Sequence, residues 1–66
     1  MTPLEILLEA LKFYEIKVTF VNGNHVKVRP NFEIEVEANG MYKLLDDGYI
    51  VAPFEDVNEL CGFMLS

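Results

Sequence analysis

Cysteine is almost absent: the chain has one, Cys61, among 66 residues. A disulfide within the chain is therefore impossible, and a zinc site built from cysteines is not expected. The N-terminus lacks the basic and apolar segments of a signal peptide, so we expect a cytoplasmic protein. No hydrophobic run approaches the roughly 20 residues that cross a bilayer, and lipidation motifs are missing, so membrane attachment is not expected.

Basic residues are also scarce. Five Lys and Arg residues stand against eleven Asp and Glu residues, which gives a net charge of −6. A protein that follows phosphates needs a basic surface, so direct nucleic-acid binding is disfavoured. Such acidity suits solubility, a basic partner or mimicry of a nucleic-acid backbone.

Glycine and proline are few, with four and three residues, and no linker or repeat interrupts the chain. Residues 1–66 are therefore expected to form a single small domain. Hydrophobic residues make up 52% of the sequence. In so short a chain this predicts that some apolar surface stays outside the core, where it could contact a partner.

Hydrophobic periodicity predicts a helix at each end and strands between them. The helical spacing of leucines over residues 3–14 follows a capping-box pattern at Thr2 and Glu5. From Ile16 onward apolar and polar residues alternate, with turn residues after each run. A second helix is predicted from Phe54 to about Leu65.

The predicted fold class is α+β. An antiparallel meander sheet of four to five strands should carry the N-terminal and C-terminal helices on one face, in the order α-β-β-β-β-(β)-α. The apolar (dry) face of every strand should face these helices, the other (wet) face should meet solvent, and directly opposed residues share a face. We therefore expect Phe20 to oppose Val26 on the dry face and Leu45 to oppose Tyr49 on the wet face.

The wet face should pair bases of one strand with acids of the next. The same register places Arg29 beside Glu33 and Lys27 beside Glu35. Exposed pairs of this kind contribute about 0.2–1 kcal/mol each, so they specify the register more than they stabilise the sheet.

A partner-binding surface is predicted where the wet face becomes apolar. Leu45, Tyr49 and Val51 are expected to lie together there beside the edge of the last strand, with Met41 near the edge. Sheet edges can pair with another chain. The preferred function is therefore a non-catalytic interaction or regulatory module that binds a protein partner or itself as a homodimer.

A second possibility rests on Glu33, Glu35 and Glu37, which alternate along one strand. Their side chains would stand about 6.6 Å apart, close to the spacing of phosphates along a nucleic-acid strand. An acidic stripe of this kind could let the protein mimic nucleic acid and inhibit a basic protein, as small phage-type inhibitors do. Nearby lysines would partly neutralise it.

A third possibility follows from Gly23-Asn24-His25, which opens a strand between two terminal helices. The segment and the element order resemble the small HicA-type toxins that cleave mRNA. The resemblance implies that His25 would act as general acid or base and that Lys27 would steady the developing charge. Those toxins look basic, however, whereas the residues beside His25 are acidic.

Metal and cofactor sites are not expected. His25 with Glu35 and Glu37 would lack a complete set of fixed ligands. Asp46-Asp47-Gly48 is typical of a turn, and the rest of an EF-hand calcium loop is absent. No glycine-rich phosphate loop is present, because Gly23 and Gly40 are isolated turn residues. We therefore predict no catalytic residues, no metal and no cofactor.

Overall fold

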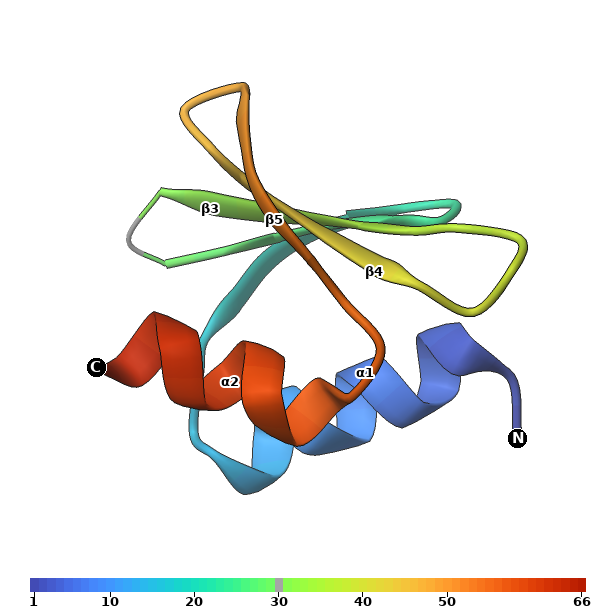
Figure 1. Cartoon of the computed structure of the whole chain (residues 1–66). Coiled ribbons are helices and arrows are strands. Elements are labelled where there is room, and N and C mark those ends of the chain that lie inside the picture. Colours follow the sequence, from blue (N-terminus) through green and yellow to red (C-terminus); the bar gives the residue numbers. More distant parts are fainter. Residues whose placement is uncertain (30) are drawn as a thin grey trace.

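The computed structural model describes residues 1–29 and 31–66, which form two helices and five strands. The elements in order are α1 (Pro3–Phe13), β1 (Val18–Asn22), β2 (His25–Val28), β3 (Phe32–Val36), β4 (Tyr42–Asp46), β5 (Tyr49–Phe54) and α2 (Val57–Leu65). The strands form one antiparallel sheet in the order β1-β2-β3-β4-β5, and both helices lie on the same side of it (Figure 1). The predicted α+β meander with terminal helices is confirmed.

Helix α1 begins and ends where its sequence dictates. Thr2 and Glu5 form the expected capping box, since the Thr2 Oγ1 accepts from the Glu5 backbone N–H at 3.2 Å and Glu5 accepts from the Thr2 N–H at 2.9 Å. Hydrogen bonding of the Glu5 carboxyl to the backbone of Thr2, and to a smaller extent to its side chain, lowers the pKa of that carboxyl. After the helix, Glu15 adopts a left-handed conformation with φ of 58°, and the Ile16 N–H donates to the Leu11 carbonyl at 2.9 Å.

Helix α2 starts three residues later than its periodicity predicted. Phe54 ends strand β5 opposite Tyr42, and Asp56 caps the helix by accepting from the Asn58 N–H at 3.0 Å. Neither described helix is long and apolar enough to cross a membrane.

The core lies between the two helices and the sheet. Its buried members are Leu7, Leu11, Val26, Val28, Ile34, Val36, Tyr42, Leu44, Val57, Leu60 and Cys61. The Tyr42 hydroxyl donates to the Pro3 carbonyl at 2.9 Å, which attaches the start of α1 to the sheet. Burial raises the pKa of the Cys61 thiol, with the negative charge of Asp56 as a smaller cause.

The β1–β2 hairpin departs from the predicted register. Its turn contains two residues, Gly23 and Asn24, with Gly23 at φ 59°, as a tight hairpin with glycine at the first central position requires. A bulge between Val18 and Phe20 shifts the pairing by one residue. Phe20 therefore opposes Lys27 instead of Val26, and its side chain leaves the helix-covered face.

The β4–β5 hairpin departs in the same way. Asp47 and Gly48, at φ 54° and 85°, form a two-residue turn closed by Asp46 and Tyr49. A second bulge follows, and Leu45 opposes Ile50 instead of Tyr49. Figure 1 shows this turn projecting away from the helices.

Candidate functional site: the open face of the sheet

The face of the sheet opposite the helices, which we call the open face, carries two rows of side chains across all five strands. Directly opposed residues share a face, so the registers define the rows. The first row is Asn22, His25, Glu35, Lys43 and Pro53, and the second row is Phe20, Lys27, Glu33, Leu45 and Ile50. Charged side chains occupy the centre of both rows, and hydrophobic side chains occupy the two ends of the second.

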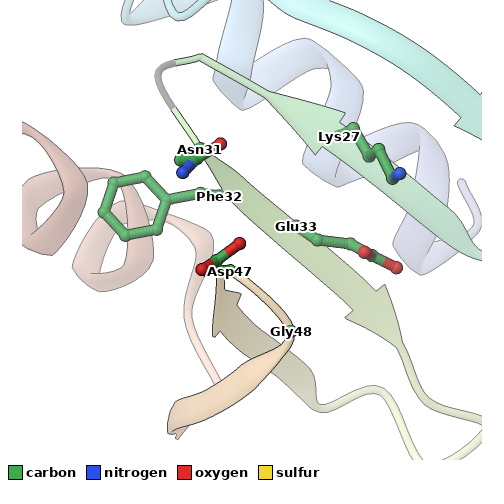
Figure 2. A pocket seen from close by; sticks show the side chains of 6 residues that line it. All are labelled: Lys27, Asn31, Phe32, Glu33, Asp47 and Gly48. Atoms are coloured by element: carbon green, nitrogen blue, oxygen red, sulfur yellow. The ribbon is translucent and has the colours of Figure 1, made fainter.

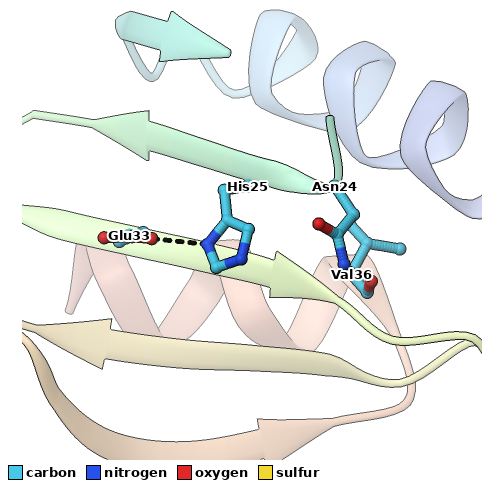
Figure 3. Close-up of polar contacts among 4 residues, drawn as sticks. All are labelled: Asn24, His25, Glu33 and Val36. Carbon is cyan, nitrogen blue, oxygen red and sulfur yellow. Dashed lines mark hydrogen bonds and ion pairs between the residues drawn. The ribbon is translucent and has the colours of Figure 1, made fainter. Parts of the chain in front are cut away.

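His25 contacts a carboxylate on the neighbouring strand. Its Nδ1 lies 2.6 Å from the Glu33 Oε2 (Figure 3). The residue directly opposite His25 is Glu35, so this contact is diagonal across the two strands. The contact orients the imidazole and leaves its Nε2 available to another group. Asn24 holds the preceding turn in place, because its Nδ2 donates to the Val36 carbonyl at 2.8 Å and its carbonyl accepts from the Val36 N–H at 2.8 Å.

The pairing between β2 and β3 is shifted by two residues from the prediction. Lys27 opposes Glu33 instead of Glu35, and His25 opposes Glu35. The faces are unchanged, because a shift of two preserves the alternation. Bases of β2 thus meet acids of β3 as expected, but with different partners.

The three residues of the predicted acidic stripe, Glu33, Glu35 and Glu37, are all half-buried. Glu33 contacts His25, and Glu37 lies 3.9 Å from the Lys43 Nζ. Glu35 stands in register between His25 and Lys43. Each carboxylate of the stripe thus has a lysine or a histidine beside it.

The predicted partner-binding residues do not form one patch. Met41 and Leu45 lie on the open-face side of the sheet, whereas Tyr49 opposes Asp46 and so shares the other face. Val51 is the extra residue of the β5 bulge. Both are nevertheless accessible at the projecting hairpin, with 78% of Tyr49 and 41% of Val51 exposed.

Sequence reasoning missed two hydrophobic residues of the open face. Ile50, beside Leu45, is 62% exposed, and Phe20, at the opposite edge, is 54% exposed. Strict alternation assigns both to the core, and the bulges that move them have no signature in the two-residue rhythm. The two-residue turns at Gly23-Asn24 and Asp47-Gly48 were the available signal.

The edge strands are β1 and β5, as the meander requires. Both contain a bulge, and β5 also contains Pro53, which has no N–H to donate. Bulges and prolines are the usual means by which edge strands avoid pairing with another chain. A contact at β5 would therefore use side chains more readily than strand addition.

A cavity of about 370 Å³ lies beside the second row, between the β2–β3 end of the sheet and the β4–β5 turn. Lys27, Asn31, Phe32, Glu33, Asp47 and Gly48 line it (Figure 2). Phe32 points toward the helix side and Glu33 toward the opposite side, so the cavity lies at the margin of the sheet.

Within residues 1–29 and 31–66, no group of three or more His, Cys, Asp or Glu side chains could hold a metal ion. No protein-family model, curated protein or solved structure matches this chain.

Proposed function

We propose that the protein is a non-catalytic interaction module that works in the cytoplasm and binds a protein partner or a second copy of itself. The contact surface is the open face together with the β4–β5 hairpin. One observation carries this proposal: Tyr49, Ile50 and Val51, three consecutive large side chains, are exposed on a single projecting hairpin. Several exposed apolar side chains on one hairpin of a small protein are typical of an interaction site.

The mode of contact follows from the edge strand. Pro53 and the bulge make β5 a poor template for another strand, so the partner should pack on side chains. The central charges of the open face would then set orientation, and the apolar residues at its margins would supply most of the affinity.

The proposal is tested with Ile50→Lys and Tyr49→Asp. Leu65→Lys on α2 is the control, because Leu65 is exposed to nearly the same extent as Ile50. Self-association is measured by sedimentation at high micromolar concentration, and partner binding by affinity capture from lysate with each variant. We expect the hairpin variants to lose the captured partner protein while the circular dichroism stays unchanged. A monomeric wild-type protein that captures the same proteins as the hairpin variants would refute the proposal.

A ribonuclease is a second candidate, favoured by the contact between His25 and Glu33. A carboxylate on Nδ1 orients a histidine whose Nε2 can exchange a proton with substrate, and Lys27 adjoins the pair in the second row. Unstructured RNA should then be cleaved by the wild-type protein and left intact by His25→Ala. Equal RNA integrity with both proteins would rule this candidate out.

A further inference from the structure

The charges of the open face reverse sign between β2 and β3. In the second row Lys27 on β2 stands opposite Glu33 on β3, and in the first row His25 stands opposite Glu35. An axis drawn parallel to the strands, midway between β2 and β3, therefore separates a basic strand from an acidic one. A two-fold rotation about such an axis places β2 of one copy over β3 of the second copy, and β3 of the first copy over β2 of the second.

We propose that the open face binds a second copy of this chain about that axis, an inference that rests on the proposed function and names its partner. Lys27 faces the partner's Glu33, and the same contact recurs with the two copies exchanged. His25 faces the partner's Glu35. In the second row, Phe20 on β1 falls over the partner's Leu45 on β4, which covers an exposed phenyl ring with an aliphatic side chain.

Two other symmetric arrangements of the faces bring like charges together. An axis above β3 sets Glu33 and Glu35 against the same residues of the partner. An axis across the strands, between the two rows, sets Glu33 against the partner's Glu35. Like charges in an interface cost several kcal/mol.

An axis between β3 and β4 fails for a different reason. It pairs Glu35 with the partner's Lys43 in the first row, but it places Lys27 over the partner's Ile50 and Glu33 over the partner's Leu45. These two charged side chains would lose water and gain no opposite charge from the partner. The axis between β2 and β3 pairs opposite signs at the centre of the second row and places the imidazole of His25 over a carboxylate in the first.

The size of the face indicates a weak dimer. Four strands about 4.8 Å apart, each contributing four to five residues at about 3.4 Å, give a flat footprint of roughly 300 Å². Standard interfaces bury about 800 Å² per partner. Each copy also carries a net charge of −6. We therefore expect association only at high micromolar concentration.

A charge exchange tests the arrangement. In Lys27→Glu, both symmetric contacts oppose two carboxylates, and in Glu33→Lys both oppose two ammonium groups. In an equimolar mixture of the two variants, every one of these contacts pairs opposite signs. We expect each variant alone to dimerise at least about tenfold more weakly than the wild type, and the mixture to form a heterodimer within about threefold of wild-type affinity.

The measurements are sedimentation equilibrium and native mass spectrometry of the mixture, with one variant isotope-labelled. Lys12→Glu and Glu59→Lys are the controls, because they make the same charge changes at exposed helix residues outside the face and should dimerise like the wild type. Circular dichroism confirms folding of each variant. Phe20→Ser changes no charge and should also weaken the dimer, which keeps the test valid if a charge variant does not fold.

Two results would overturn the inference. A wild-type protein that stays monomeric to about 1 mM refutes the inferred dimer. The proposed function would still stand in that case if Ile50→Lys loses a protein that the wild type captures. A wild-type dimer that both charge variants retain, or that the mixture fails to restore, refutes the axis. Tyr49 and Ile50 on β5 lie outside the four overlapping strands, so Ile50→Lys and Tyr49→Asp should keep this dimer. Capture of the same proteins by these two variants and by the wild type would refute the proposed function separately.

Discussion

Leu44 and Leu45 are consecutive residues of β4 that face opposite sides of the sheet, so replacing each with alanine tests the assignment of the two faces. Leu44 is fully buried against the helices, whereas Leu45 is half-buried on the open face. Truncating a buried leucine removes apolar contacts and leaves a cavity, at a cost of about 2–5 kcal/mol. We expect Leu44→Ala to fall in this range and Leu45→Ala to cost about 1 kcal/mol or less.

The magnitude is large for a chain of this length. A 66-residue protein is stable by roughly 3–10 kcal/mol. A loss of about 3 kcal/mol lowers the melting temperature by roughly 12–24 °C for a domain of this size. Leu44→Ala should therefore unfold at a clearly lower temperature than the wild type, whereas Leu45→Ala should keep a transition near that of the wild type.

The assay is urea unfolding followed by far-UV circular dichroism. Protein is kept at low micromolar concentration so that self-association does not add to the stability of the native state. Both substitutions change the same residue type in the same strand, so differences in strand propensity cancel. Equal destabilisation by the two, or a larger effect of Leu45→Ala, would refute the assignment of the faces.

Two further predictions concern the cysteine and the glycines. Burial raises the pKa of the Cys61 thiol, so the unfolded chain loses the thiol proton at a lower pH than the folded protein, and stability should fall as pH rises above the ordinary pKa of a thiol. At neutral pH a disulfide reagent should react with Cys61 at least about a hundredfold more slowly in the folded protein than in urea. Gly62→Ala should stabilise α2 by about 0.5–1 kcal/mol, whereas Gly23→Ala should cost about 1 kcal/mol because its φ is 59°. A new Cβ meets no atom within 4 Å at either glycine, so a difference in urea midpoints reports backbone conformation and equal midpoints would contradict it.

The helices and the sheet order could be predicted because they depend on local signals. The capping box at Thr2 and Glu5 fixed the start of α1, and the leucine spacing fixed its buried face. The boundary of α2 was harder to predict, since Phe54 fits both a helical face and the end of a strand. Packing opposite Tyr42 decided in favour of the strand.

The registers could not be predicted from alternation alone. Alternation states which residues share a face in an unbroken strand, but it does not reveal an extra residue within a strand. Each bulge in β1 and β5 reversed the face of the residues between itself and the turn. For that reason Phe20 and Ile50 were assigned to the core, and Tyr49 to the wet face.

The β5 bulge explains how one strand serves two surfaces. Ile50, Ala52 and Phe54 occupy every second position, so an unbroken strand would place all three on the helix-covered face. With the bulge, Ala52 and Phe54 stay opposite Leu44 and Tyr42, and Ile50 moves to the open face. Full burial of an isoleucine stabilises a protein by about 1.5–3 kcal/mol, a large fraction of what a core of this size supplies. A small protein that leaves Ile50 and Phe20 in water forgoes that stability, and departures of this kind from local rules are expected where a surface serves binding.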